Sequence, residues 1–194
     1  MNIVERVKKL ILQPRQEWLV IDGETHTVQG LYTQYVMILA AIPAVCGLIG
    51  FSLIGIGTFG ATYRLPIAAG VAHMVVGYLL SLGTVYMFAL IIDALAPNFG
   101  SQKNFNQALK VAAFAPTAAW IAGVFTLIPS LSIIGSLLAL YSLYLLFVGL
   151  PILMKTPEDK AVPYVVVVII AAIVIAVVIA ALVGLTMPGP VRGF

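Results

Sequence analysis

The 194-residue chain contains few charged residues: they make up 9% of the sequence, against about 25% in ordinary soluble proteins. This leaves too little polar surface to cover a water-soluble domain. The chain also lacks a basic patch with interleaved aromatic residues, which disfavours nucleic-acid binding. The composition therefore excludes an ordinary soluble fold and argues against a nucleic-acid partner.

Cysteine is almost absent as well. The single Cys46 lies in an apolar run, so neither an intrachain disulfide framework nor a thiolate metal site can form. Asp22, Glu24 and His26 cluster in the sequence, but their spacing matches no closed metal site, and a polar connector explains them equally well. We predict no metal and no cofactor.

Catalytic patterns are also missing. Ser52 and Ser81 lie beside glycines in apolar runs, but no spacing supplies a partnered histidine or an oxyanion hole. The chain shows no phosphate-binding glycine-rich loop and no paired carboxylates. We therefore predict no catalytic residues and a protein that is not an enzyme.

What the chain has instead is five long hydrophobic runs, and each is long enough to cross a bilayer as a helix. In lipid a single segment satisfies its own backbone only as a helix. The sequence predicts an all-α polytopic membrane bundle with five spans, at Tyr35–Ile56, Pro66–Ala96, Asn106–Ile128, Leu131–Met154 and Val162–Leu185. The corresponding organisation is a segment 1–34, a transmembrane domain 35–187 and a short tail 188–194.

The first 34 residues contain no apolar core of signal-peptide length, so we expect the first span to stay in the mature protein. Within them, apolar residues recur at helical spacing and Pro14 ends the pattern. This predicts a short amphipathic helix that either lies on the inner leaflet or packs on the protein's own cytoplasmic loops. The apolar residues are Ile3, Val4, Val7, Leu10 and Ile11.

The basic residues lie almost entirely on one side of the five runs. With a cytoplasmic N-terminus, eight of the ten fall on the cytoplasmic side, and only Arg64 and Arg192 fall on the other. The positive-inside rule then predicts a cytoplasmic N-terminus and a periplasmic or external C-terminus. The eight are Arg6, Lys8, Lys9, Arg15, Lys103, Lys110, Lys155 and Lys160.

Asp93 is the only acidic residue within a predicted span, which makes it a functional candidate. It lies about 18 Å from the middle of its helix, so we expect it near the cytoplasmic headgroups, where it could meet Lys103 or Lys110. A structural or interfacial role is favoured over an ion or proton site. His73 is about 30 Å away along the same helix, which excludes a dyad and favours a packing histidine over a relay.

Pro43 and Pro116 fall within predicted spans, where each can kink its helix. Matched breaks of this kind mark substrate sites in transporters. The last span carries a small residue at every fourth position, which lets helices approach closely. We call these residues the ladder: they are Ala172, Ala176, Ala180 and Gly184. The ladder either packs inside the bundle or forms an exposed face for self-association.

Several short motifs occur in a characteristic order. They are Pro14-x-x-x-Trp18-x-x-Ile21-x-x-Glu24, Ala41-Ile42-Pro43, Asn106-Gln107-Ala108-x-Lys110, Ala115-Pro116, and Gly149 with Pro151. With five spans, this order resembles the Yip family, membrane proteins named for interaction with Ypt/Rab GTPases, and in particular its small bacterial inner-membrane branch.

The resemblance covers nearly the whole chain and implies five spans, a cytoplasmic N-terminus, an external C-terminus and no enzymatic activity. The Asp-Leu-Tyr-Gly-Pro motif of eukaryotic members is echoed only by Gly30-Leu31-Tyr32-Thr33-Gln34, and their long N-terminal domain does not precede the first span. These departures argue against small-GTPase binding.

Two hypotheses follow. The first is a non-catalytic membrane protein that acts in membrane organisation, or as a partner of itself or of another membrane protein, through close helix packing. The alternative is a small transporter or permease that uses Asp93 and the proline-kinked helices.

Overall fold

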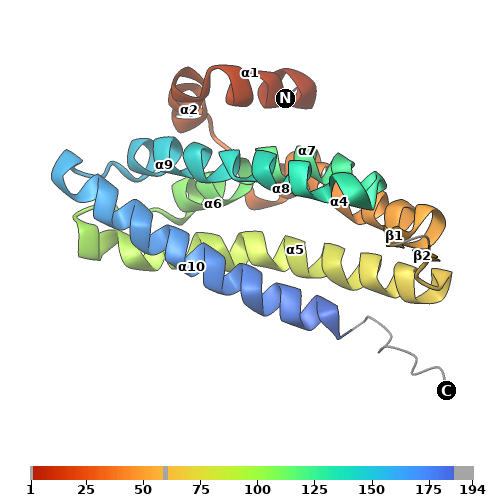
Figure 1. Ribbon diagram of the computed structural model, residues 1–194. Coiled ribbons are helices and arrows are strands. Elements are labelled where there is room, and N and C mark those ends of the chain that lie inside the picture. Colours follow the sequence, from red (N-terminus) through yellow and green to blue (C-terminus); the bar gives the residue numbers. More distant parts are fainter. Residues whose placement is uncertain (1, 59–60, 186–194) are drawn as a thin grey trace.

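The computed structural model describes residues 2–58 and 61–185, and these form a helical bundle with two further helices at the N-terminus (Figure 1). Five segments are long and apolar enough to cross a membrane, which confirms the predicted fold class. They are Val28–Ile54, Ile67–Phe99, Phe105–Leu127, Pro129–Met154 and Glu158–Gly184. Arg192 and the predicted tail 188–194 lie outside the described residues.

The first span begins earlier than Tyr35, because helix α3 (Val28–Leu31) leads directly into it. A π-helical turn (Tyr32–Val36) joins α3 to helix α4 (Met37–Leu48), and a second π-helical turn (Ile49–Ile54) ends the span. The Thr27 side chain accepts a hydrogen bond from the Gly30 amide and caps this helical start.

A short β-hairpin connects the first and second spans, and the sequence analysis did not predict it. Strand β1 (Ile56–Thr58) pairs antiparallel with strand β2 (Ala61–Tyr63). Gly55, with φ of 89°, turns the chain out of the first span in a conformation that favours glycine. The sequence could not indicate these strands, because three residues in each are too few to show an alternation of apolar and polar positions.

The second span is one long helix, α5 (Ile67–Leu95), continued by a 3-10 turn (Ala96–Phe99). At helical rise the 29 residues of α5 extend about 43 Å, which exceeds the hydrocarbon thickness of a bilayer.

The third and fourth spans are segmented. The third consists of α6 (Phe105–Phe114), α7 (Thr117–Ala122) and a 3-10 turn (Gly123–Leu127). It breaks at Ala115 and Pro116, because proline supplies no backbone N–H to continue the helix. The fourth consists of a 3-10 turn (Pro129–Leu131), α8 (Ser132–Ala139) and α9 (Tyr141–Met154).

The fifth span is helix α10 (Glu158–Gly184), which starts before the predicted Val162. Glu158 and Asp159 occupy its first turn, where acidic side chains interact favourably with the helix dipole. Figure 1 shows α10 crossing the outside of the bundle beside α5.

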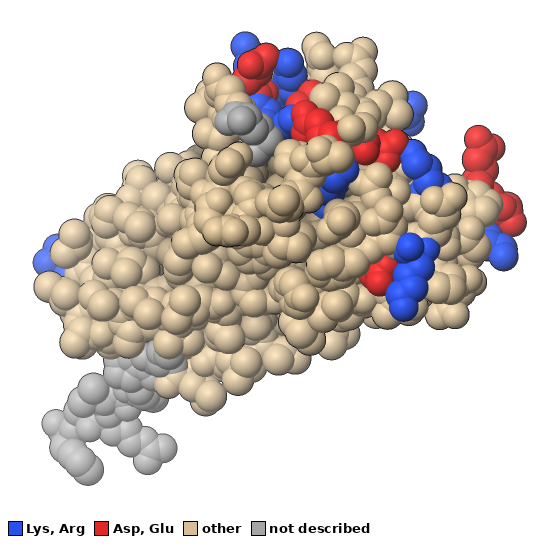
Figure 2. Space-filling view, turned by 180° about the vertical axis from the view of Figure 1, so that it is seen from behind, with Lys and Arg blue, Asp and Glu red and all other residues tan. Residues whose placement is uncertain are grey.

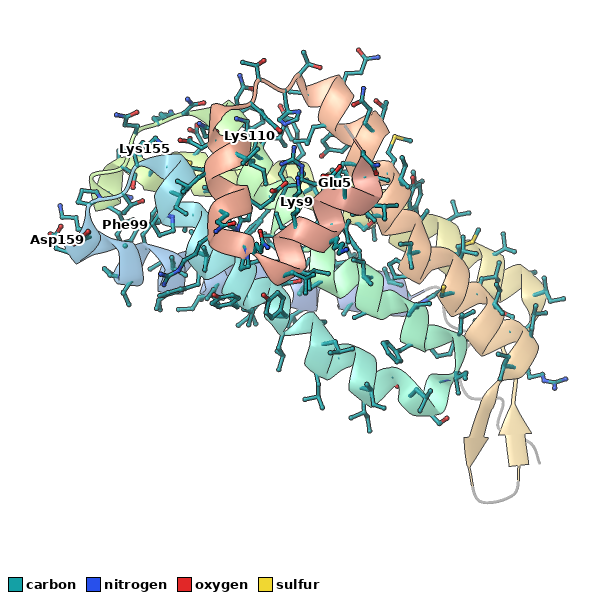
Figure 3. The ribbon with its side chains drawn as sticks, turned by 90° about the horizontal axis from the view of Figure 1, so that it is seen from above. Glu5, Lys9, Phe99, Lys110, Lys155 and Asp159 are labelled. Atoms are coloured by element: carbon teal, nitrogen blue, oxygen red, sulfur yellow. The ribbon has the colours of Figure 1, made fainter. Side chains whose placement is uncertain are left out.

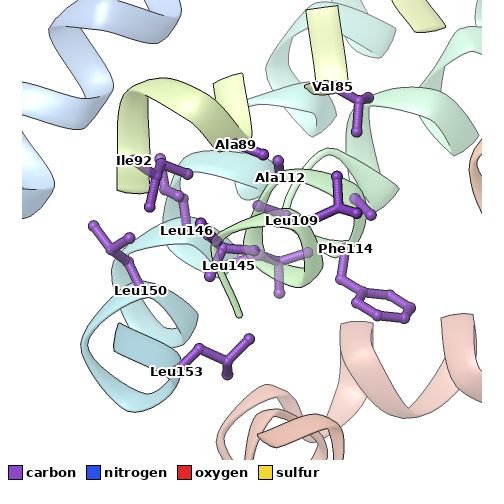
Figure 4. Close-up of a cluster of buried hydrophobic side chains, with 14 of the residues drawn as sticks. Val85, Ala89, Ile92, Leu109, Ala112, Phe114, Leu145, Leu146, Leu150 and Leu153 are labelled. Carbon is purple, nitrogen blue, oxygen red and sulfur yellow. The ribbon is translucent and has the colours of Figure 1, made fainter. Parts of the chain in front are cut away.

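The core lies where α5, α6 and α9 meet. Figure 4 shows the aliphatic side chains of these helices pointing toward one another, with α6 in the middle. Of the apolar window in the third span, 72% is buried, against 11% in the fifth span, so the bundle is built around the third span. The buried side chains include Val85, Ala89, Ile92, Leu109, Ala112, Leu145, Leu150 and Leu153.

The N-terminus forms two helices, α1 (Ile3–Leu12) and α2 (Pro14–Gly23), which lie on one flank of the bundle (Figure 1). The Asn2 side chain caps α1 by accepting hydrogen bonds from the amides of Val4 and Glu5. Pro14 ends α1 as expected, but it also begins α2, which was not predicted. Proline suits the first helical position because its missing N–H is not needed there.

Candidate functional site

Polar side chains of the N-terminal helices meet the third and fourth spans on one flank of the bundle. We call this cluster the N-terminal clasp. Figure 2 shows most of the charged residues of this face gathered over this region and the adjacent end of the molecule. The clasp consists of Arg6, Glu17, Trp18, Asp22, Glu24, His26, Gln107, Lys110, Gly149 and Lys155.

Arg6 is the central cation of the clasp. Its guanidinium is 8% exposed and donates to Glu17 Oε1 at 2.6 Å and to Glu24 Oε1. Its Cζ also lies 5.8 Å from the centroid of the Phe114 ring, close enough for a cation–π contact. Arg6 therefore ties α1 both to α2 and to the segment that leads into the first span.

Glu24 receives a second contact, because His26 Nε2 lies 2.8 Å from its other carboxylate oxygen. Burial alone would raise the pKa of Glu24, but the hydrogen bonds from Arg6 and His26 outweigh it and hold the pKa below its ordinary value. The carboxylate is thus stabilised in its charged form.

Lys110 enters the clasp from α6 and is only 4% exposed. Its ammonium donates to the carbonyl oxygens of Ile21 at 2.9 Å, Asp22 at 3.3 Å and Glu24. These carbonyls lie at the C-terminal end of α2, where helical oxygens lack intrahelical partners and the dipole favours a cation. Lys110 therefore fixes the end of α2 onto α6, and Figure 3 shows it beneath the N-terminal helices.

Asp22 joins the same helix end to two other segments. Its Oδ1 accepts a hydrogen bond from Gln107 Nε2 at 2.8 Å, and its Oδ2 accepts one from Lys155. Lys155 follows α9 in a left-handed conformation, with φ of 52°. The third span, the fourth span and α2 are thereby held together by one carboxylate.

The Trp18 ring is fully buried beneath these polar contacts. It lies so close to Gly149 of α9 that a Cβ there would fall 2.3 Å from the ring. Its other neighbour is the Phe114 ring, in an edge-on contact at 6.3 Å. Glycine at position 149 is thus what allows α2 to pack against α9.

A further polar contact, between Tyr35 and Thr117, lies beside the Phe114 ring. The Tyr35 ring contacts the Phe114 ring at a tilt of 57°, with 4.6 Å between ring centroids, and its hydroxyl hydrogen-bonds the Thr117 hydroxyl at 2.7 Å. The Thr117 hydroxyl reaches the carbonyl of Phe114 across the break in the third span. The break at Pro116 is thus bridged by side chains of two spans.

Asp93 lies apart from the clasp. It is buried on α5, and the expected pairing with Lys103 or Lys110 is not seen: among residues 2–58 and 61–185 no ion pair includes Asp93. The reason for Lys110 is clear, since its ammonium is fully occupied by the carbonyls of α2. The carbonyl of Ile92, the residue before Asp93, accepts a hydrogen bond from the Tyr164 hydroxyl of α10.

His73 and Pro43 do come together. Both line a cavity of about 260 Å³ between the first and second spans, with Gly77 and Thr126 also in its wall. Asp93 is not among its lining residues, in agreement with the separation expected from the sequence.

Pro116 lines a different cavity of about 270 Å³, which is bounded by α5, the broken third span, α9 and α10 and is partly open. Half-buried Ala172 and exposed Ala176 form part of its wall, whereas Ala180 and Gly184 are exposed and line neither cavity. The small-residue ladder is therefore divided into an inward half and an outward half. Ser81 lines both cavities.

The cluster of Asp22, Glu24 and His26 belongs to the clasp. Within the described part of the chain no three or more histidine, cysteine, aspartate or glutamate side chains are grouped to hold a metal ion. The sequence analysis missed Arg6, Glu17 and Gln107 as site residues. Gln107 stands in one of the family motifs, and its spacing to Lys110 could have indicated a shared helix face.

Comparison with known proteins agrees with these observations. The family model described as the Yip1 domain matches residues 8–180. The chain is 27% identical over 160 residues to the inner membrane protein YohC of Escherichia coli K12, a match that covers 80% of this chain and 82% of the relative. YohC of Escherichia coli O6:H1 matches to the same extent. No solved structure matches.

Proposed function

The chain belongs to the Yip1 domain family and is an integral membrane protein of the inner-membrane type, and on this premise we propose that it acts without catalysis in membrane organisation. The clasp fixes α1 and α2 as a rigid hairpin at the cytoplasmic side of the bundle. The outer face of that hairpin contacts the inner leaflet.

The observation that carries this proposal is the outer face of the hairpin. Its inner face is buried on the bundle, yet four large aliphatic side chains remain exposed beside Lys8 and Arg15. Aliphatic groups next to basic ones are typical of helices that lie in a membrane interface and meet anionic headgroups. The four are Val4 (72% exposed), Leu12 (66%), Leu19 (62%) and Val20 (52%).

The distribution of charge supports a cytoplasmic position for the hairpin. Lys110 and Lys155 contact α2 directly, so the basic N-terminal segment, the start of the third span and the connection after the fourth span share one flank. The positive-inside rule assigns a flank with this excess of lysine and arginine to the cytoplasm.

The absence of catalysis is supported by how the polar groups are used. The carboxylates and cations of the clasp bind one another or backbone carbonyls, and each such contact joins two structural elements. These groups hold the hairpin in place, and the exposed surface beside them is aliphatic and basic.

The proposal is tested by the depth of the hairpin in a bilayer. A spin label at Leu19, in a Cys46→Ser background, should sit at the headgroup level in nanodiscs that contain anionic lipid. Leu19→Asp should reduce the binding of spin-labelled anionic lipid to the protein, and Thr25→Asp, which adds the same charge at an exposed loop position, should not. A fully water-exposed label at Leu19, or equal effects of the two variants, would contradict the proposal.

We further propose that the outward half of the ladder contacts a second copy of the chain. Ala180 and Gly184 are exposed on the least buried span, and a Cβ added at Gly184 would meet no other atom within 4 Å. Ala180→Leu should lower the dimer fraction measured by single-molecule photobleaching in vesicles, and unchanged step counts would rule out this contact.

A second candidate is a small permease. It is favoured by one observation: the cavities that contain Pro43 and Pro116 share Ser81 in their walls, so two proline-containing spans flank adjacent hollows. Solute flux into proteoliposomes that is lost in Pro116→Ala and in Asp93→Asn would support this function. Flux equal to that of empty vesicles for a broad solute panel would exclude it.

A further inference from the structure

The cavity of about 270 Å³ between α5, the third span, α9 and α10 has no occupant in the chain itself. We propose that it is a binding site for one acyl chain of a membrane phospholipid. This inference concerns the interior of the bundle and does not depend on the clasp or on the membrane-organising function proposed above.

Depth is the first argument. The cavity has walls from four spans, and in each span at least one lining residue lies at or next to the middle of the span. These residues are Ser81 and Thr84 of the second span, Pro116 of the third, Ser142 of the fourth and Ala172 of the fifth. The hollow therefore lies at the bilayer midplane, where the ends of acyl chains are found.

The chemistry of the walls is the second argument. Three hydroxyl groups line the cavity, and each is already engaged: Ser81 donates to the Tyr78 carbonyl at 2.7 Å and Thr84 to the Leu80 carbonyl at 2.8 Å. The Ser142 hydroxyl accepts a hydrogen bond from the Ala119 amide at 2.9 Å, just beyond the break at Pro116. Because these hydroxyls are already bonded to protein atoms, the walls offer a cavity water few of the polar partners that it needs.

The origin of the hollow is the third argument. The break at Pro116 interrupts the helix on one wall, and Ala172 and Ala176 on the opposite wall carry side chains too small to fill the gap. Apolar cavities of this kind stay dry and take up hydrocarbon. Because the cavity is open on one side and the bundle stands in lipid, a neighbouring acyl chain is the hydrocarbon at hand.

The experiment is photo-crosslinking in nanodiscs with phosphatidylethanolamine that carries a diazirine near the end of one acyl chain. We expect labelled peptides from α5 and α10 that include Thr84 and Ala176. Ala176→Phe fills the cavity and should remove most of this labelling. Ala181→Phe makes the same change at an exposed position of the same helix and should leave it intact. Equal labelling in the two variants would overturn the proposal.

A second measurement keeps the test independent of how well one variant folds. In lipid-poor detergent, added phospholipid should raise the Tm of the native chain more than that of Ala172→Leu, which fills part of the same cavity. Equal shifts would overturn the acyl-chain site. Preferential labelling by a polyprenyl probe over the phospholipid probe would also overturn it, as would labelling that disappears when the protein is diluted to monomers.

Discussion

The N-terminal clasp and the midplane cavity both contain polar groups removed from water, but they satisfy them in opposite ways. In the clasp, partners come from distant parts of the sequence: Lys110 binds the Ile21 carbonyl and Lys155 binds Asp22. In the cavity, two of the three hydroxyls bind carbonyls of their own helix, Ser81 three and Thr84 four residues earlier, and only Ser142 joins two spans, through the Ala119 amide.

This difference separates two uses of polar groups in a membrane protein. Contacts between elements determine how helices pack, so the clasp fixes the position of α1 and α2. Contacts within one helix leave packing undetermined, so the region around the cavity can remain open. Substitutions in the two regions should therefore differ in their effect on stability.

The largest effect is expected from Arg6→Met. This variant leaves Glu17 buried without its cation, and breaking a buried ion pair in this way typically costs about 3–5 kcal/mol. Hydrogen–deuterium exchange in nanodiscs should show α1 and α2 losing protection while α5 and α6 keep theirs. The control is Lys9→Met, which removes an exposed pair with Glu5 and should leave exchange almost unchanged. Equal exchange in both variants would show that Arg6 does not hold α1 and α2 in place.

Gly149→Ala should have the next largest effect. The new Cβ would lie 2.3 Å from the Trp18 ring, and overpacking of this kind costs about 1–3 kcal/mol. The Tm in detergent should fall. Gly83→Ala makes the same change on α5 where no atom lies within 4 Å, so it should hold or raise the Tm. A rise in both variants would mean that α2 does not pack against α9.

The pH dependence of the clasp gives a smaller effect. Because the pKa of Glu24 is lowered in the folded protein, its contribution to stability is present above the ordinary pKa of 4.5 and is lost as the pH falls through the lowered value. Exchange of α1 amides should therefore rise only in acid. Glu24→Gln should flatten this dependence, and an identical acid profile in that variant would assign it to another group.

The smallest effect is expected in the cavity. Thr84→Val removes a hydroxyl bonded only to its own helix, so the Tm should change little. Thr117→Val removes the hydroxyl that Tyr35 binds across two spans, and should cost about 1 kcal/mol. A larger loss in Thr84→Val than in Thr117→Val would reverse the distinction between contacts within one helix and contacts between spans.

The sequence predicted what depends on composition and length. Runs of apolar residues gave the five spans, and the helical spacing from Ile3 to Ile11 gave α1. The family motifs contained Trp18, Lys110 and Gly149, but their meeting depends on packing between residues up to 131 positions apart, which no local pattern reveals. The second role of Pro14, as the first residue of α2, was missed for the same reason: its helix is stabilised by contacts with α9 rather than by a strong pattern of its own.

For Asp93, the sequence predicted the position in the helix but not the partners. Its position near the end of α5 was predicted from helical rise alone, but the predicted pairing with Lys103 or Lys110 was not found, and Lys110 instead binds three carbonyl oxygens at the end of α2. Similarly, the ladder from Ala172 to Gly184 was recognised from its spacing, whereas its division between a cavity wall and an exposed face depends on where α10 leaves the bundle.

The central claim is that the clasp holds the N-terminal hairpin against the bundle in the membrane. It is tested most directly by electron paramagnetic resonance distances between spin labels at Gln16 on α2 and Tyr144 on α9, both exposed, in a Cys46→Ser background in nanodiscs. We predict a single narrow distance distribution that broadens in Arg6→Met. A broad distribution in the otherwise native chain would contradict the claim.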